Sequence, residues 1–199
     1  MAARRVGLES SATRIVILDA TEQLMLEEGY AAVSTRRVAG KAGLKPPLVH
    51  YYFPKTDDLL LAVYRRSAER NQERLAKALA SETPLQALWM LNTDAMRTGL
   101  AVEFMGMATH RKVIRDEIAH YVQRSRSAQA ETLTRLFSNQ KLDPSVCPPS
   151  GVSMLIAGIS RSLIMEEALG ISSGHAEAVA FVEWWLQRLD ADRASRSTG

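Results

Sequence analysis

Apolar residues recur along the chain with the spacing of helices, and no stretch alternates apolar and polar positions convincingly over several residues. Between residues 14 and 30, Ile17, Leu18, Leu24 and Met25 fall at i, i+1, i+7 and i+8, which places them on one stripe of an amphipathic helix. Gly29 follows as a natural end for that helix. The pattern predicts an all-α protein.

Two short helices are expected next. Ser34 can cap a helix over residues 35–42, and Gly43 can adopt the positive φ that ends it and turns the chain. Pro46 stands where a second helix begins, because its missing N–H does no harm there, and Val49 can then face inward. A helix, a glycine turn and a second short helix form the sequence pattern of a helix-turn-helix, whose second helix enters the DNA major groove.

The remaining two thirds of the chain also have helical spacing. Thr56 can cap a long helix reaching about residue 80, and Pro84 opens another. Gly99 and Gly106 bracket a short apolar piece. Further helices are predicted over about residues 111–138, 148–169 and 175–189. The polar tail, residues 190–199, is expected to be disordered.

Composition fits a folded protein of one or two small domains. Of the 199 residues, 46% are hydrophobic and 24% charged, as in ordinary globular chains. The single cysteine, Cys147, excludes an intrachain disulfide framework and fits a reducing compartment. No segment approaches a signal peptide or a membrane span, so we expect a cytoplasmic protein without a membrane partner.

The positive charge is concentrated near the predicted helix-turn-helix. Residues 1–56 contain eight Lys or Arg and five Asp or Glu, an excess equal to the net charge of +3 of the whole chain. The remainder holds 17 basic and 17 acidic residues and is neutral. An excess of three is small, but its position is where attraction to DNA phosphate is needed.

Signals for enzymatic chemistry are poor. The four histidines show no metal-ligand spacing, and no phosphate-binding glycine loop or nucleophile motif is present. Glu166 and Glu167 form a carboxylate pair without a partner base, which favours a solvated or salt-bridged role. We therefore expect no enzyme, no metal and no cofactor.

Five sequence pieces, in order and with matching spacing, extend the helix-turn-helix pattern. They are Ile17-Leu18-x-Ala20, Gly29-Tyr30, Val38-Ala39-x-x-Ala42-Gly43, Tyr52-Phe53-Pro54 and Asp57-x-Leu59-Leu60. Over about residues 12–62 the chain resembles the tetracycline-repressor (TetR) family of bacterial transcription regulators. The resemblance implies an N-terminal arm and three-helix helix-turn-helix domain over residues 1–55. It also implies a C-terminal helical domain for effector binding and dimerisation over residues 56–199.

The same resemblance identifies candidate residues for DNA contact, which surround the two short helices. They are Ser34, Thr35, Arg36, Arg37, Lys45, Leu48, His50, Tyr51 and Lys55. Three positions depart from the family pattern. Arg37 stands where many relatives have Asp, Lys55 lies one residue before the usual lysine, and Pro46-Pro47-Leu48 replaces small and hydroxyl residues. Fewer hydrogen bonds to base edges are expected than is usual in the family, although Leu48 can touch a thymine methyl.

Bulky apolar and flexible side chains in the C-terminal half are candidates for an effector pocket, and core packing explains each of them equally well. The candidates are Trp89, Met90, Thr93, Met96, Phe104, Met107, Tyr121, Met154, Arg161 and Met165. The candidates for a dimer interface are Ile156, Trp184 and Trp185, with one tryptophan expected to face the core and the other a partner.

The sequence favours a homodimeric, DNA-binding transcriptional regulator, released from a double-stranded, pseudo-palindromic operator by an apolar or amphipathic small molecule. Three alternatives stay open. They are an activator, a regulator without a small-molecule effector, and a helical binding or carrier protein that has lost DNA recognition, for which Pro46-Pro47-Leu48 is the only support.

Overall fold

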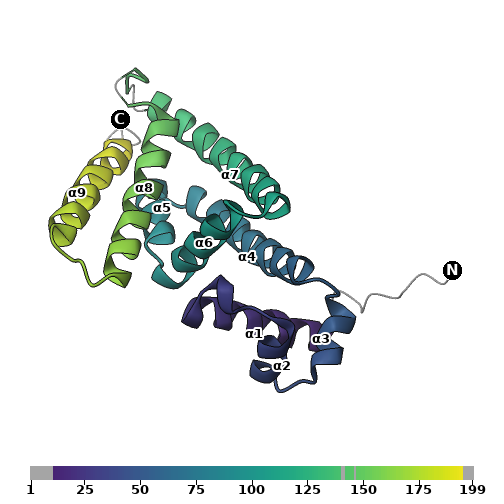
Figure 1. The fold of residues 1–199 in the computed structure, drawn as a ribbon. Coiled ribbons are helices and arrows are strands. Elements are labelled where there is room, and N and C mark those ends of the chain that lie inside the picture. The colour runs from purple at the N-terminus through teal and green to yellow at the C-terminus, as the bar shows by residue number, and fades with distance from the viewer. Residues whose placement is uncertain (1–10, 140–141, 146, 195–199) are drawn as a thin grey trace. The chain divides into compact units, whose positions relative to one another are not determined.

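The computed structural model describes residues 11–139, 142–145 and 147–194, and over these residues the chain is helical with no strand. Figure 1 labels the α-helices. The elements are α1 (Ala12–Glu28), the 3-10 helix η1 (Tyr30–Ala32), α2 (Thr35–Lys41), α3 (Pro46–Tyr52), α4 (Thr56–Leu79), α5 (Pro84–Asn92), α6 (Ala95–Ala108), α7 (Lys112–Asn139), α8 (Pro149–Ala168) and α9 (His175–Ala194). The prediction of an all-α fold is confirmed. No helix among these residues is long and apolar enough to cross a membrane.

The chain packs as two compact units that do not follow a single cut in the sequence. Unit 1 is Met1–Glu69 with Glu103–Asp116, and unit 2 is Arg70–Val102 with Glu117–Gly199. As a result, α4, α6 and α7 each begin in one unit and end in the other. The predicted domain boundary after residue 55 is a division by function, and it stays a prediction. The division by packing lies elsewhere, inside α4 between Glu69 and Arg70.

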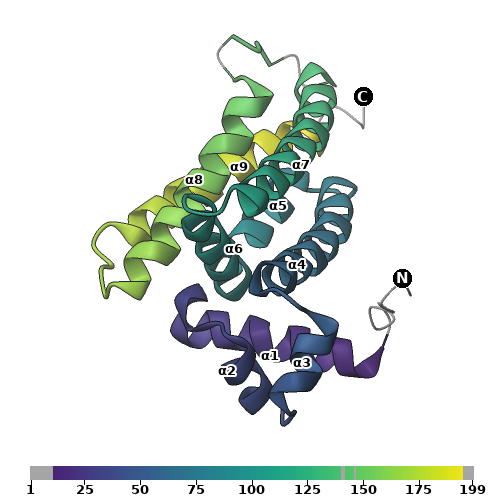
Figure 2. The ribbon, with the colours of Figure 1, turned by 45° about the vertical axis from the view of Figure 1, so that its right-hand side comes forward.

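In unit 1, the first three helices form a tight cluster in which α2 lies against both α1 and α3 (Figure 2). The buried stripe of α1 contains Ile17, Leu18, Leu24 and Met25, each at most 2% exposed, as the spacing predicts. Thr21 lies on the same stripe, and its hydroxyl donates to the carbonyl of Ile17 at 2.7 Å.

In unit 2, α5 packs against both α8 and α9 around one apolar cluster. Its members come from five helices: Leu75, Leu85, Leu88, Trp89, Leu133, Leu136, Phe137, Val152, Ile156, Val182, Leu186 and Leu189. Because these residues are far apart in sequence, unit 2 depends on long-range packing more than unit 1 does.

Two expectations from the sequence are wrong. Gly99 and Gly106 do not bracket a separate short piece, since α6 runs through both without a positive φ at either. A glycine inside a helix costs about 1 kcal/mol relative to alanine, which a packed helix tolerates. The start of the polar tail is also ordered, since α9 continues to Ala194; residues 195–199 lie outside the described part.

The ordered start of the tail has a structural cause. Asp190 is only 5% exposed, and its carboxylate accepts hydrogen bonds from the backbone N–H groups of Leu85 (3.5 Å) and Gln86 (3.1 Å). These are donors in the first turn of α5, where no earlier carbonyl is available. Asp190 therefore caps a helix that lies about a hundred residues earlier in the chain.

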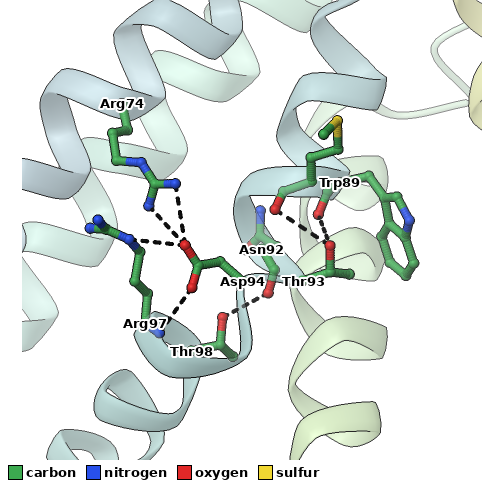
Figure 3. A network of polar contacts seen from close by, with 8 residues as sticks. Arg74, Trp89, Asn92, Thr93, Asp94, Arg97 and Thr98 are labelled. Atoms are coloured by element: carbon green, nitrogen blue, oxygen red, sulfur yellow. Dashed lines mark hydrogen bonds and ion pairs between the residues drawn. The ribbon is translucent and has the colours of Figure 1, made fainter.

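A polar network joins α4 to the turn between α5 and α6 (Figure 3). Asp94 binds the guanidinium of Arg74 at 3.2 Å and that of Arg97 at 3.0 Å. Around it, Thr93 and Thr98 donate to backbone carbonyls, so this turn satisfies its polar groups locally. These contacts hold the turn that leads into α6.

Candidate nucleic-acid interface

The turn between α2 and α3 has the geometry that the sequence predicts. The Ser34 hydroxyl accepts from the backbone N–H of Arg37 at 3.4 Å and so caps α2. At the other end, Gly43 has φ of +66°, and the N–H of Leu44 donates to the carbonyl of Ala39 at 2.9 Å. This is the hydrogen bond of a Schellman ending, for which glycine is favoured because it has no Cβ.

Helix α3 presents its predicted outer face. Pro46 and Pro47 occupy its first turn, and Lys45 precedes them without a side-chain cap. Val49 is fully buried, whereas Leu48 is 38% exposed and Tyr51 47% exposed. Because two prolines remove two N–H donors, this first turn offers fewer backbone hydrogen bonds to phosphate than an ordinary helix start.

Contacts at the end of α3 hold it against α1. The guanidinium of Arg14 lies over the ring of Phe53, 5.2 Å from its centroid, and Phe53 is 5% exposed. The hydroxyl of Ser11 donates to the phenol oxygen of Tyr52 at 3.1 Å. Tyr52 in turn meets the ring of Tyr51 edge-on, with centroids 5.3 Å apart. The exposed face of α3 is thereby oriented by the start of α1.

Ion pairs sort the basic residues near this face into two groups. Arg37 contacts both carboxylate oxygens of Glu28 at 2.5 Å, and Lys41 contacts Glu27 at 2.6 Å. The hydrogen bond from Arg37 holds the pKa of Glu28 below its usual value. By the same bond, the pKa of Arg37 is raised. The carboxylates of α1 thus partly neutralise Arg37, a candidate for DNA contact, and Lys41 on the same helix.

Three further basic residues near this face form no ion pair within the described part of the chain. Arg36, Lys45 and Lys55 are exposed, and within the described part of the chain none of them has a carboxylate partner. Thr35 is half-buried at the start of α2, and His50 is exposed on α3. Sequence reasoning missed the distinction between Arg36 and Arg37, because Glu28 lies nine residues from Arg37 and on another helix. Arg4 and Arg5, in the predicted arm, lie outside the described residues.

The segment 103–116 is bound into unit 1 by three contacts and by the burial of Met107. A carboxylate oxygen of Glu103 accepts from the N–H of Tyr30 at 2.8 Å, beside Gly29 with φ of +80°. Phe104 meets Tyr64 edge-on, with ring centroids 5.0 Å apart. Arg111 is ion-paired with Asp57. Met107 is fully buried in the same unit. The end of α6 therefore supports the loop that leads into α2.

Ion pairs also link α4 to α1. Arg66 contacts Asp19 and Glu22, each at 2.7 Å, with its side chain 15% exposed. Beside these helices lies a groove of about 610 Å³ whose walls include Arg14, Leu18, Tyr52 and Leu61. None of the ten effector candidates lines it.

The structure does not gather the effector candidates into one place. Phe104 and Met107 belong to the core of unit 1, and the others lie in unit 2. Within unit 2, Trp89 is buried, Tyr121 accepts a hydrogen bond from Asn71 at 2.8 Å, and the Thr93 hydroxyl donates to its own helix. The remaining side chains are mostly exposed methionines: Met90 (72%), Met96 (61%), Met154 (48%) and Met165 (51%).

Arg161 is half-buried on α8 and has no carboxylate partner among the described residues. Burial lowers its pKa, and the nearby charge of Arg126 adds to that effect. Glu166, for which the sequence favours a solvated or salt-bridged role, binds His175 at 2.9 Å and Ser162 at 3.1 Å.

The interface candidates separate cleanly by burial. Trp184 is 52% exposed. Its ring centroid lies 6.0 Å from that of Phe181 and 5.3 Å from the guanidinium carbon of Arg188. Trp185 is half-buried and packs against the core of unit 2. Ile156 is 2% exposed within that core, so its assignment to an interface is corrected: its surface is already covered by its own chain.

Groups that could carry other chemistry are sparse. Within the described residues, no three His, Cys, Asp or Glu side chains are placed to hold a metal ion. Burial raises the pKa of the Cys147 thiol, which lowers the fraction of reactive thiolate.

Known bacterial regulators are similar to this chain in sequence. Residues 17–63 match the model of bacterial regulatory proteins of the tetR family. The chain is 28% identical over 150 residues to an uncharacterized HTH-type transcriptional regulator in the dhlA 5′ region of Xanthobacter autotrophicus, covering 68% of this chain and 72% of that protein. It is 36% identical over 97 residues to the HTH-type transcriptional repressor KstR of Mycolicibacterium smegmatis, covering 46% and 48% of the two chains.

Solved structures share the fold. A TetR-family transcriptional regulator from Rhodococcus sp. superposes with a TM-score of 0.74 at 17% identity, covering 90% of this chain and 100% of that one. A transcriptional regulator from Saccharomonospora viridis in complex with choline superposes with a TM-score of 0.69 at 20% identity, covering 89% and 93%.

Proposed function

We propose that this chain is a DNA-binding transcriptional regulator of the TetR family, and that it acts as a homodimeric repressor released from a pseudo-palindromic operator by a small molecule. The observation that carries the proposal is the outer face of α2 and α3, where exposed cations that have no carboxylate partner among the described residues flank an exposed Leu48 and Tyr51. We expect such a protein to be cytoplasmic and to have no catalytic activity.

Each exposed group on this face has a distinct task. Lys45 and Lys55 flank α3 and bind phosphate, which positions the helix in the major groove. Leu48 contacts a thymine methyl, and His50 and Tyr51 reach base edges or phosphate. Arg36 reaches the DNA with its full charge, whereas Arg37 must first leave Glu28. Ser34 and Thr35 bring the start of α2 to the backbone.

The test uses Arg36 and Arg37 as a matched pair. An operator is selected from random duplexes, and its affinity is measured by fluorescence anisotropy over a series of salt concentrations. Loss of one phosphate contact lowers the slope of log affinity against log salt by about 0.9. Arg36→Ala is expected to lower both slope and affinity clearly, and Arg37→Ala to lower them less. Tyr51→Phe should weaken specific binding with no change of slope.

Helical circular dichroism of each variant controls for folding. Equal affinity of the wild type, Arg36→Ala and Tyr51→Phe for the selected operator would contradict this assignment of DNA contacts. Failure of the wild type to bind any duplex would instead favour a helical binding protein that has lost DNA recognition.

Exposed apolar side chains on α8 and α9 support the dimer. Met154, Leu155 and Met165 lie on α8, and Phe181 and Trp184 lie on α9, each between 48% and 63% exposed in the single chain. Large apolar side chains that lack cover within their own chain are a common mark of a protein–protein interface. Two copies of the helix-turn-helix held by such an interface would match a two-fold operator.

Sedimentation velocity tests the dimer. Trp184→Glu places a charge in the proposed interface and is expected to raise the dissociation constant at least tenfold. Gln123→Glu, which adds the same charge at an exposed position of α7 outside the proposed interface, should leave it nearly unchanged. A wild-type monomer that binds the operator one protein per palindrome would overturn the proposal.

Three helices shared between the units support release by an effector. Because α4, α6 and α7 each have residues in both units, a ligand that favours another arrangement of unit 2 acts on elements that also build unit 1. One of these helices, α6, carries Glu103, which accepts a hydrogen bond from the N–H of Tyr30 beside the loop before α2. The complex of the related fold from Saccharomonospora viridis with choline supports small-molecule binding in this class of protein.

The coupling is testable through Glu103. A compound library is screened by thermal shift, and hits are tested for release of the operator. By linkage, an effector and the operator weaken each other's binding by the same factor, typically about 5- to 150-fold. Glu103→Gln, which keeps an acceptor oxygen for the Tyr30 N–H, should largely retain this factor, and Glu103→Ala should reduce it. A screen without any stabilising compound would favour a regulator that has no small effector.

A further inference from the structure

A row of polar side chains runs along the inner face of α7 in unit 2. Tyr121, Ser125 and Gln129 are spaced four residues apart, which puts them one above another on the helix. Each end of the row is tied to a neighbouring helix. The Tyr121 phenol accepts from Asn71 of α4, and the Ser153 hydroxyl of α8 donates to Gln129.

The row begins where the apolar core of unit 2 ends. On α7, Leu133 belongs to the core cluster and Gln129 lies one turn before it. On α4, Leu75 belongs to the cluster and Asn71 lies one turn before it. The same change from apolar to polar side chains thus occurs on two helices, which the hydrogen bond between Asn71 and Tyr121 connects.

Helix α8 shows the same change. Its core residue Ile156 is followed one turn later by Ser160, which is 1% exposed. The Ser160 hydroxyl donates to the carbonyl of Ile156 at 2.8 Å, the usual way in which a buried helical serine is satisfied. Three helices therefore exchange apolar for uncharged polar side chains next to one core.

Ser125, in the middle of the row, differs from its neighbours. It is 7% exposed, and its hydroxyl oxygen is buried without a hydrogen-bond partner among the residues that the structure describes. Buried hydroxyls are hydrogen-bonded in the large majority of folded proteins, so an unpartnered one calls for an explanation. Ser160 shows that a serine on the inner side of this unit can bond to its own helix, and Ser125 does not do so.

The partners in the row define the chemistry that would complete it. They are an amide, a phenol and hydroxyl groups, all uncharged. Arg126, the next residue on α7, is exposed and directs its guanidinium to the sulfur of Met154. The groups of the row supply no counter-ion to a charged ligand group, whereas a neutral oxygen needs only a hydrogen bond. The half-buried Arg161 of α8 lies near Arg126, and the decanoate probe below tests whether it supplies a counter-ion instead.

We propose that Ser125 is the hydrogen-bonding anchor for an uncharged oxygen, a hydroxyl or a carbonyl, of an otherwise apolar effector. The apolar part of that molecule adjoins the core cluster around Leu75, Leu133 and Ile156. The proposal rests on the effector response proposed above and specifies the chemical class of the effector.

The experiment compares three probes of equal chain length: 1-decanol, 2-decanone and decanoate. Binding is followed by thermal shift and by quenching of tryptophan fluorescence, to which the core residue Trp89 contributes. The alcohol and the ketone are expected to bind the wild type at least tenfold more tightly than the carboxylate does. Ser125→Ala should weaken their binding about 3- to 10-fold, the range for one neutral hydrogen bond. Ser127→Ala, at an exposed position of α7, is the control and should change nothing.

The unliganded variants separate a ligand anchor from a structural serine. Since its hydroxyl has no partner, Ser125→Ala should leave the melting temperature of the free protein unchanged or raise it. A lowered melting temperature would show that Ser125 serves the fold through a bound water, and would overturn the proposal. The proposal would also be overturned if the alcohol and the ketone did not bind. Equal binding of these two probes to the wild type and to Ser125→Ala would overturn it as well.

Operator binding without any probe, measured in parallel, keeps the two proposals apart. If the protein binds its operator and another compound releases it equally from wild type and Ser125→Ala, only the anchor fails. If the protein binds no operator, the proposed repressor function fails, whatever the probes do.

Discussion

The helix-turn-helix cluster in unit 1 and the core of unit 2 are stabilised by contacts of different range. In the first, α2 is capped by Ser34, ended by Gly43 and packed on helices that adjoin it in sequence. In the second, α5 is capped by Asp190 and packed on α8 and α9, so its partners lie far along the chain. Local sequence rules therefore describe the first region well and the second poorly.

The largest expected effect is loss of core packing in unit 2. Leu88→Ala removes a side chain that is 1% exposed and should lower the free energy of unfolding by about 2–5 kcal/mol. Met90→Ala on the same helix removes a side chain that is 72% exposed, and should change it by less than about 0.5 kcal/mol. Calorimetry or urea unfolding measures both, and equal effects would contradict the burial assigned to α5.

Removal of the long-range cap should have a smaller effect. Asp190→Ala leaves two N–H groups at the start of α5 without their acceptor, and should cost about 1–2 kcal/mol of stability. Asp190→Asn keeps one acceptor oxygen and should cost less. Hydrogen exchange of the Leu85 and Gln86 amides locates the effect; unchanged protection in Asp190→Ala would refute the cap.

Two glycines of the helix-turn-helix provide a matched test of local geometry. Gly43→Ala forces alanine to a φ of +66°, which costs about 1–2 kcal/mol and should also weaken operator binding. Gly40→Ala lies inside α2 with open space around the new methyl group, and should be neutral or stabilising by up to about 1 kcal/mol. Thermal unfolding measures both substitutions, and similar destabilisation by the two would contradict the left-handed turn at residue 43.

The smallest expected effect concerns pH at the turn between α8 and α9. Hydrogen bonds from His175 and then Ser162 lower the pKa of Glu166 from its ordinary value of 4.5. A carboxylate with a lowered pKa in the folded state adds stability that is fully present above the ordinary value. That stability is lost as the pH falls through the lower, folded-state pKa.

Glu166→Gln should therefore make stability depend less steeply on pH below about 4.5 than it does in the wild type. Glu167→Gln is the control, since that neighbouring side chain is exposed. Acid unfolding followed by circular dichroism measures the difference, and identical acid profiles for wild type and Glu166→Gln would exclude a role for this contact.

Much of unit 1 could be predicted because its signals are close together in the sequence. The apolar stripe of α1, the cap at Ser34, the turn at Gly43 and the inward side of Val49 each follow from residues a few positions apart. The predicted exposure of Leu48 and Tyr51 follows from the same helical period.

Electrostatics at the interface could not be predicted in the same way. Arg36 and Arg37 are adjacent in sequence, yet only Arg37 faces a carboxylate, because the packing of α2 on α1 brings Glu28 beside it. Likewise, sequence could not decide between Trp184 and Trp185, whose exposure depends on how α9 packs on the core cluster.

The sequence by itself determined the helical fold, the helix-turn-helix and most helix starts, since caps, prolines and apolar periods act over one or two turns. Only the tertiary structure placed Phe104 and Met107 in unit 1, Ile156 in the core and Asp190 at the start of α5. These placements depend on contacts between helices up to about a hundred residues apart, which a local pattern does not specify. The unpartnered Ser125 hydroxyl is of the same kind, because the lack of a partner becomes visible only when every neighbouring helix is in place.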